Sequence, residues 1–205
     1  MTSKPDALAD VSRETMERLE IYAALLKKWN PAINLVAKST LGDLWQRHIV
    51  DSVQVFSRAP ETVDHWVDIG SGGGFPGMVC AILAAEKRGG CRFTLIESDQ
   101  RKAAFLRTVA RDTGAKVDVL AKRIESVPPQ NADVLSARAL ASLDKLFEFA
   151  ECHLKPTGRA LFPKGESYQQ EIEEARARWH FSADVIPSIT DGKAVVLSIG
   201  GLERV

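Results

Sequence analysis

One segment strongly restricts the fold of this chain: residues 65–77, with the sequence His-Trp-Val-Asp-Ile-Gly-Ser-Gly-Gly-Gly-Phe-Pro-Gly. Val67 and Ile69 are strand formers in a short apolar run and predict a buried strand. Four of the five residues from 70 to 74 are glycine, which permits positive φ and close approach of the backbone to a ligand. Pro76 suits the first turn of a following helix. A strand, a turn and a helix in this order predict a nucleotide-binding site with free backbone N–H groups at the helix N-terminus.

An acidic residue before the turn bears on which nucleotide binds. Gly72, Gly74 and Gly77 fit the spacing of the dinucleotide fingerprint, but such a match alone is weak evidence. Asp68 lies two residues before Gly70 and is expected to place a carboxylate beside the turn, which suits a cationic ligand better than a pyrophosphate. The run from Asp68 to Gly74 resembles the first motif of S-adenosylmethionine (SAM) methyltransferases. A turn with spare glycines and no ligand is the alternative.

Composition excludes several classes of protein. The 205 residues are 45% hydrophobic and 26% charged, as in a globular chain with one sizeable core. The formal net charge is zero, so a nucleic-acid partner would have to be held by a local patch. Cys80, Cys91 and Cys152 lack the spacing of a zinc site or disulfide framework, which predicts no metal and a cytoplasmic location. No apolar run approaches membrane-spanning length.

Two helices are predicted before the glycine-rich segment. Apolar residues recur at helical spacing over residues 8–29, and Pro31 is expected to end this helix. A second helix is predicted over residues 39–56. Residues 1–60 are thus expected to form a helical N-terminal cap, and residues 61–205 a separate ligand-binding domain.

The rest of the chain alternates strands with helices. This order predicts an α/β fold with a mixed, mostly parallel seven-stranded sheet and helices on both of its faces. The last two strands are expected to form an antiparallel edge. After the first strand, the strands are predicted at residues 91–96, 116–120, 133–136, 159–162, 181–186 and 194–199.

Several side chains follow predicted strands and are expected to meet a ligand at the carboxyl edge of the sheet. Glu97 ends the second strand, where an acidic residue can accept hydrogen bonds from a ribose. Ile124 and Glu125 follow the third strand and are expected to pack on a base and accept its amino group. Arg138 leaves the fourth strand toward the same crevice.

Two polar groups remain ambiguous by themselves. Arg47, His48 and Asp51 are spaced to share a helix face, and spacing alone favours a solvated face with one ion pair. The helix after Glu97 carries a local basic patch, although such runs are usually solvated. The patch comprises Arg101, Lys102, Arg107 and Arg111.

Taken together, these motifs resemble the RsmG family, also called GidB, nearly from end to end. The resemblance implies a Rossmann-like class I SAM-dependent methyltransferase that methylates N7 of a guanosine in the decoding-region hairpin of 16S ribosomal RNA. S-adenosyl-L-methionine would be the cofactor and S-adenosyl-L-homocysteine the product. The motifs are Asn34-Leu35, Arg47-His48-x-x-Asp51-Ser52, Asp68 to Gly77, Arg123-Ile-Glu125, Ser136-Ala-Arg138-Ala139 and Lys164-Gly165.

The resemblance also implies roles for individual residues. Gly70, Phe75, Ile124, Glu125 and Arg138 would contact SAM, with Glu97 on its ribose. Asp68, Ser71 and Gly72 complete the predicted cofactor set. Two positions depart from the family pattern, since Glu97 stands where Asp is common and Pro163 where an ordinary apolar residue is usual.

Guanine N7 has a free lone pair, so its methylation requires no general base, and the predicted contribution of the enzyme is alignment. Arg138 or Lys164 is expected to donate to guanine O6 or to a flanking phosphate. The expected RNA contacts are Asn34, Arg47, His48, Asp51, Arg101 and Lys102.

Other functions are compatible with the residues. A methyltransferase for a small molecule or protein is the first alternative, and a non-catalytic SAM-binding ribosome assembly factor is the second. A nicotinamide oxidoreductase is disfavoured by Asp68. The expected partner is 16S rRNA or the small ribosomal subunit, and nothing in the sequence indicates more than a monomer.

Overall fold

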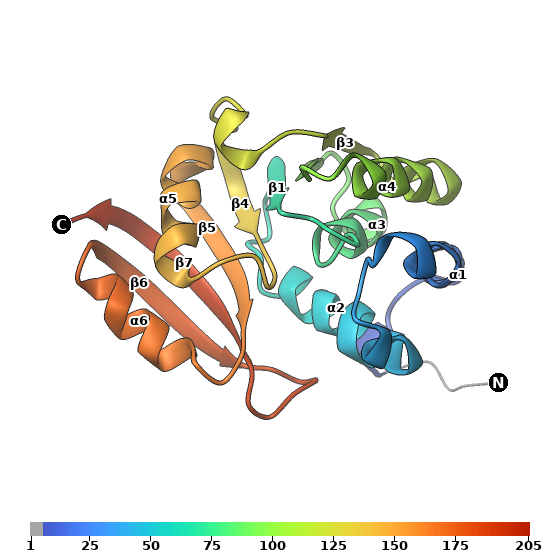
Figure 1. Cartoon of the computed structure of the whole chain (residues 1–205), viewed down its shortest axis with the longest axis horizontal. Coiled ribbons are helices and arrows are strands. Elements are labelled where there is room, and N and C mark those ends of the chain that lie inside the picture. The colour runs from blue at the N-terminus through green and yellow to red at the C-terminus, as the bar shows by residue number, and fades with distance from the viewer. Residues whose placement is uncertain (1–5) are drawn as a thin grey trace.

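A computed structural model describes residues 6–205 as one seven-stranded sheet flanked by helices (Figure 1). The strand order is β3-β2-β1-β4-β5-β7-β6. The first five strands pair in parallel, and β7 is antiparallel to both β5 and β6. The predicted mixed sheet with an antiparallel edge is confirmed. The strands are β1 (His65–Ile69), β2 (Arg92–Ile96), β3 (Val117–Leu120), β4 (Ala132–Ser136), β5 (Leu154–Lys164), β6 (Trp179–Pro187) and β7 (Val195–Arg204).

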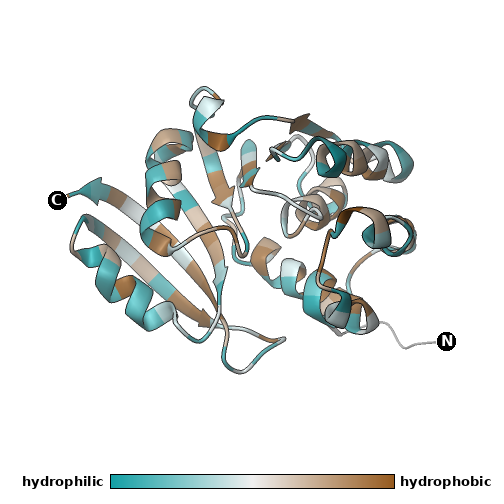
Figure 2. Cartoon of the chain, viewed as in Figure 1, coloured by the Kyte–Doolittle hydropathy of each residue, from teal (hydrophilic) through white to brown (hydrophobic). Residues whose placement is uncertain are grey.

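Helices cover both faces of the sheet and bury two clusters of hydrophobic residues. All five residues of β1 are buried, as expected for a central parallel strand. Its side chains alternate, so Trp66 joins one cluster while Val67 and Ile69 join the other. Figure 2 shows the outward face of α6 as hydrophilic. The helices are α1 (Arg13–Ile33), α2 (Asp51–Phe56), α3 (Gly77–Lys87), α4 (Gln100–Thr113), α5 (Leu143–His153) and α6 (Tyr168–Arg176).

The first helix differs from the prediction at both ends. It begins at Arg13, because the Ser12 side chain accepts a hydrogen bond from the Thr15 N–H and caps it. Residues 6–8 form a separate 3₁₀ turn, η1 (Asp6–Leu8). Pro31 does not end the helix, which continues to Ile33 and stops where Asn34 adopts a left-handed φ of 49°. A proline removes its own helical N–H bond, and here only two more helical residues follow it.

The second predicted helix is three segments of different geometry. A 3₁₀ segment, η2 (Lys38–Asp43), is followed by a π-helical segment, η3 (Trp45–Val50), and then by α2. The Ser52 hydroxyl donates to the His48 carbonyl at 2.7 Å, and such side-chain bonds compete with a regular helical ladder. π segments are frequent at functional sites, and this one carries Arg47 and His48.

The N-terminal helices share a core with the sheet. α1 packs on α3 and α4, and α2 packs on α3. The division of the chain at residue 60 stays a prediction, and residues 1–5 of the predicted cap lie outside the described residues. None of the described helices has the length and apolar character needed to cross a membrane.

Candidate functional site

A cavity of ≈ 990 Å³ lies at the carboxyl edge of the parallel strands. Open α/β sheets bind their ligands at this edge. Its wall combines the glycine turn after β1, the ends of β2 and β4, and segments of the N-terminal helices and of the β6–β7 loop. The volume is at the upper end of the range for small-molecule sites, so it has room for a nucleotide and part of a second reactant.

The glycine turn packs closely against α1 and β1 on the side away from the cavity. Gly74 has a φ of 95°, and a Cβ there would lie 2.6 Å from the Tyr22 hydroxyl. This hydroxyl donates a hydrogen bond to the Gly73 carbonyl. At Gly77, a Cβ would lie 2.5 Å from the Asp68 Cβ. The glycines therefore let α1 and Asp68 support the turn closely while its other side faces the cavity.

Asp68 is a buried carboxylate behind the turn. Its residue is 1% exposed, Oδ1 accepts from the Ser136 hydroxyl at 2.6 Å, and Oδ2 has no hydrogen-bond partner among the described residues. Burial raises the pKa of Asp68 to about 6, against the opposing effect of the Ser136 bond. The carboxylate lies against Gly77 at the start of α3, where the helix dipole favours negative charge. Asp68 is thus beside the turn as predicted, but it is not part of the cavity wall.

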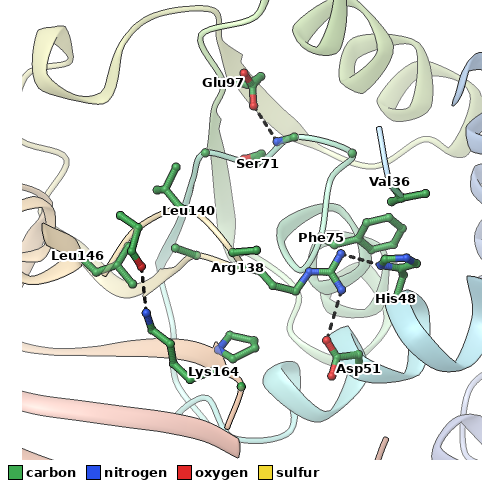
Figure 3. Close-up of a pocket in the computed structure, with 18 of the residues that line it drawn as sticks. Val36, His48, Asp51, Ser71, Phe75, Glu97, Arg138, Leu140, Leu146 and Lys164 are labelled. Carbon is green, nitrogen blue, oxygen red and sulfur yellow. Dashed lines mark hydrogen bonds and ion pairs between the residues drawn. The ribbon is translucent and has the colours of Figure 1, made fainter. Parts of the chain in front are cut away.

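Glu97 lies in the wall and holds the glycine turn. Its Oε2 accepts from the Gly72 N–H and its Oε1 from the Asp99 N–H, both at 2.7 Å. Figure 3 shows the bond to the turn, next to Ser71. Each carboxylate oxygen has two lone pairs, so both can accept a further hydrogen bond from a ligand.

Ile124 and Glu125 also lie in the wall, in the 3₁₀ turn η4 (Ile124–Ser126). Ile124 is buried and Glu125 is exposed. The imidazole of His153 at the end of α5 lies 3.3 Å from the Ile124 carbonyl and fixes this turn. Burial lowers the pKa of His153, so its neutral form makes this bond.

Arg138 is the centre of a network that joins the loop after β4 to the N-terminal helices (Figure 3). Its Nη2 lies 2.8 Å from His48 Nδ1, and its Nη1 donates to Asp51 Oδ2 at 3.3 Å and to the Arg47 carbonyl at 3.2 Å. The guanidinium carbon lies 4.9 Å from the centroid of the Phe75 ring. Arg138 therefore keeps Nε–H and one Nη2–H for a ligand.

The ring of His48 is neutral in this network. Burial and the nearby charges of Arg138 and Arg47 lower its pKa to about 4. Because Arg138 can only donate, Nδ1 is the acceptor, and Nε2–H donates to the Thr40 hydroxyl at 2.8 Å. His48 thereby orients the guanidinium without adding a second positive charge.

Asp51 is fixed from its other side. Its Oδ1 accepts from Gln54 Nε2 at 2.8 Å and from the Thr190 hydroxyl at 2.9 Å. Thr40, Gln54 and Thr190 were not predicted from the sequence. Thr190 lies 139 residues from Asp51 in the chain, so no local spacing could have indicated this contact.

Lys164 lies at the end of β5 and holds the loop after β4. Its Nζ donates to the Ala141 carbonyl at 2.9 Å and to Glu171 at 2.7 Å. Glu171 also accepts from the Leu143 N–H at 2.8 Å. Pro163 leaves β5 intact, since it pairs with Val196 of β7. Lys164 is in the wall, with one N–H left for a ligand.

Some predicted RNA contacts lie outside the cavity wall. Asn34 forms the left-handed end of α1, and Arg101 pairs with Asp99 at 3.4 Å on the surface of α4. Arg47 and Lys102 do line the cavity. The wall also includes Gly70, Ser71, Gly72 and Phe75 of the predicted cofactor set. Among the described residues, no group of three or more His, Cys, Asp or Glu could hold a metal ion.

Comparison with known sequences gives a consistent assignment. Residues 15–196 match the family described as GidB, rRNA small subunit methyltransferase G. The chain is 59% identical over 196 residues to the ribosomal RNA small subunit methyltransferase G of Ruegeria sp. strain TM1040, covering 96% of this chain and 95% of that protein. It is 56% identical over 202 residues to the protein of the same name from Ruegeria pomeroyi, covering 98% of each.

Comparison with solved structures identifies the fold. A ribosomal protein L11 methylase from Lactobacillus delbrueckii subsp. bulgaricus superposes with a TM-score of 0.59 at 19% identity, covering 75% of this chain and 78% of that chain. A SAM-dependent methyltransferase from Aquifex aeolicus superposes with a TM-score of 0.57 at 14% identity, covering 86% and 96%. The predicted class I SAM methyltransferase fold is confirmed.

Proposed function

The chain belongs to the GidB family of rRNA small subunit methyltransferases, and on this basis we propose that it methylates N7 of one guanosine in 16S rRNA with SAM as the methyl donor. The observation that carries the proposal is the composition of the cavity wall. It joins a glycine turn and Glu97, which suit a nucleoside cofactor, to cationic groups after β4 that suit an acceptor base.

The wall supports SAM as the cofactor. Glu97 retains lone pairs for ribose hydroxyls, and Ile124 offers an apolar surface for the adenine. The turn at Gly70–Gly72 offers backbone groups, and Glu125 an exposed carboxylate for the adenine amino group. Asp68 lies beside the turn, and its pKa of about 6 leaves it ionised at neutral pH. Its negative charge favours a ligand with sulfonium and ammonium charges.

The reaction needs alignment and no proton acceptor. The bound cofactor supplies a methyl group on a sulfonium, which guanine N7 accepts through its in-plane lone pair without losing a proton. The wall is consistent with a reaction that needs no proton acceptor. His48 is its only histidine among the described residues. The pKa of His48 is about 4 and both of its ring nitrogens are hydrogen-bonded, so it is a poor base at neutral pH. Fixed groups that hold two reactants in line supply a large part of such a rate enhancement.

Arg138 and Lys164 are proposed to position the guanine. Each keeps a donor free after its internal bonds, and guanine O6 is an acceptor beside N7. Arg138 is held by His48 and Asp51, so those two side chains act through it.

The RNA backbone is proposed to follow weakly paired or unpaired cations that line the cavity. Lys102 and Arg123 line the cavity, and neither side chain has a hydrogen-bond or ion-pair partner in the described part of the chain. Arg47 is half-exposed and only loosely paired with Asp191 at 3.7 Å. Unpaired cations of this kind suit phosphates.

The test is methyl transfer to small ribosomal subunits from a strain that lacks this gene. Purified protein and SAM with a deuterated methyl group are added, and the nucleosides are analysed by mass spectrometry. The expected result is deuterated 7-methylguanosine in 16S rRNA. Label in another nucleoside, in a ribosomal protein or in a small molecule would identify a different acceptor. SAM binding without any transfer would indicate a non-catalytic SAM-binding assembly factor.

A further inference from the structure

The loop between β6 and β7 presents an apolar side chain beside the cavity. Ser188, Thr190 and Asp191 line the cavity wall, whereas Ile189 between them does not. Ile189 is 56% exposed. Figure 1 shows this loop projecting beyond the ends of its two strands. The loop thus places polar residues toward the reactants and one branched apolar residue toward solvent at the same rim.

The loop is fixed, so the exposure of Ile189 is not that of a loose segment. The Ile189 N–H donates to Gln54 Oε1 at 3.0 Å, and Gln54 Nε2 donates to the Ser188 hydroxyl at 3.0 Å. The Thr190 hydroxyl donates to Asp51 at 2.9 Å, and the Ser188 N–H to the Ala194 carbonyl at 2.9 Å. Gln54 is a buried amide, and burying an amide is costly unless it is hydrogen-bonded, as it is here to Ser188 and Ile189 at the start of the loop.

Exposure alone would not set Ile189 apart. Val185 and Ile21 are 42% and 40% exposed, and single exposed apolar residues are normal on protein surfaces. Ile189 differs in its place, because cavity-lining residues flank it on both sides and the half-exposed Arg47 reaches Asp191 of the same loop at 3.7 Å. An exposed apolar residue on a loop that also contacts a cation, next to the proposed base-binding cavity, suits a nucleic acid, which offers stacked bases beside phosphates.

The proposed reaction creates a need for such a group. A guanosine in a structured hairpin must leave its stack to reach the cavity, and this unstacking is unfavourable. Proteins that unstack nucleic acids often insert an apolar side chain such as isoleucine into the gap. We propose that Ile189 is a substrate-positioning residue that enters the RNA stack beside the guanosine while the base is held in the cavity. This inference rests on the proposed function.

The test compares Ile189→Ala and Ile189→Leu with the wild type, using Val185→Ala on the neighbouring strand as the matched control. Methyl transfer to small subunits is measured under single-turnover conditions, and SAM affinity is measured separately. Ile189→Ala is expected to lower transfer about tenfold, because it removes most of an apolar contact. Ile189→Leu keeps the apolar volume and is expected to stay within about threefold of the wild type. Val185→Ala and all SAM affinities are expected to be unchanged.

A second substrate separates base unstacking from simple docking. In small subunits whose 16S rRNA carries a mismatch beside the guanosine, the stack is already weakened, so Ile189→Ala is expected to recover most of its rate. An equal loss on both substrates would show that Ile189 is only a docking contact and would overturn the inference, as would an Ile189→Ala variant with full activity on normal subunits. Failure of the wild type to methylate RNA would instead refute the proposed function itself.

Discussion

Replacing Asp68 with Asn is expected to change how stability depends on pH. The carboxylate is 1% exposed and one of its oxygens has no hydrogen-bond partner in the described structure, so its negative charge is costly to bury. Burial raises the pKa of Asp68 from 3.8 to about 6. A raised acid pKa means that the ionised group destabilises the folded state at high pH, and that this penalty fades as the pH falls from 6 toward 4.

The size of the effect follows from the two pKa values. The penalty in the wild type is about 3 kcal/mol at pH 8 and about 2 kcal/mol at pH 5. Asn does not titrate, so the free energy of unfolding of Asp68→Asn relative to the wild type is expected to be about 1 kcal/mol higher at pH 8 than at pH 5. A constant cost from placing an amide against the start of α3 leaves this difference unchanged.

Urea denaturation followed by circular dichroism at pH 5, 6.5 and 8 measures this difference, and titration calorimetry measures SAM binding. We expect the stability of the variant relative to the wild type to rise with pH. We also expect the variant to bind SAM more weakly than the wild type, because the variant lacks the negative charge that favours the cationic cofactor. A stability difference that is independent of pH, or one that rises as the pH falls, would refute the reasoning about the buried charge.

Three further predictions concern other parts of the site. His48 has a pKa of about 4 in the fold and stays neutral, so its contribution to stability is present above pH 6.5 and is lost as the pH falls toward 4. His48→Asn should therefore reduce the loss of stability between pH 7 and pH 4.5 by about 2–3 kcal/mol in urea titrations, and an unchanged pH profile would contradict this. Lys164→Ala removes the hydrogen bond to the Ala141 carbonyl and should misplace the loop after β4. Methyl transfer to small subunits should then fall about 100-fold with little change in SAM affinity. Equal losses of transfer rate and SAM affinity would refute the role of Lys164 in positioning. Lys102→Ala should weaken RNA binding and reduce the magnitude of the slope of log affinity against log salt concentration by about 0.7–0.9. Filter binding at several salt concentrations measures this slope, and an unchanged slope would exclude a phosphate contact.

The sequence predicted those features of the site that depend on local chain geometry. The glycine turn, the strand before it and Glu97 at the end of β2 follow from residues close together in the chain, and the structure has them as predicted. The mixed, mostly parallel character of the sheet also follows from the alternation of strands and helices, whereas the strand order comes from the structure.

The contacts around Arg138 could not be predicted in this way. Spacing placed His48 and Asp51 on one face, but what that face meets is decided by Arg138, which lies 90 residues beyond His48, and by Thr190. The predicted boundaries of the N-terminal helices were also wrong. Pro31 is tolerated because only two more helical residues follow it, and the π segment at residues 45–50 includes the carbonyl of His48, whose bond from the Ser52 hydroxyl propensities do not describe.

We propose that this cavity promotes methyl transfer by alignment, without a general base. The direct test is the rate of single-turnover methyl transfer to small ribosomal subunits, with saturating SAM, between pH 6.5 and 8.5. Because guanine N7 carries no proton and His48 has a pKa of about 4, the rate is expected to be flat over this range. A rate that rises about tenfold per pH unit would reveal a proton acceptor in the reaction and contradict the claim.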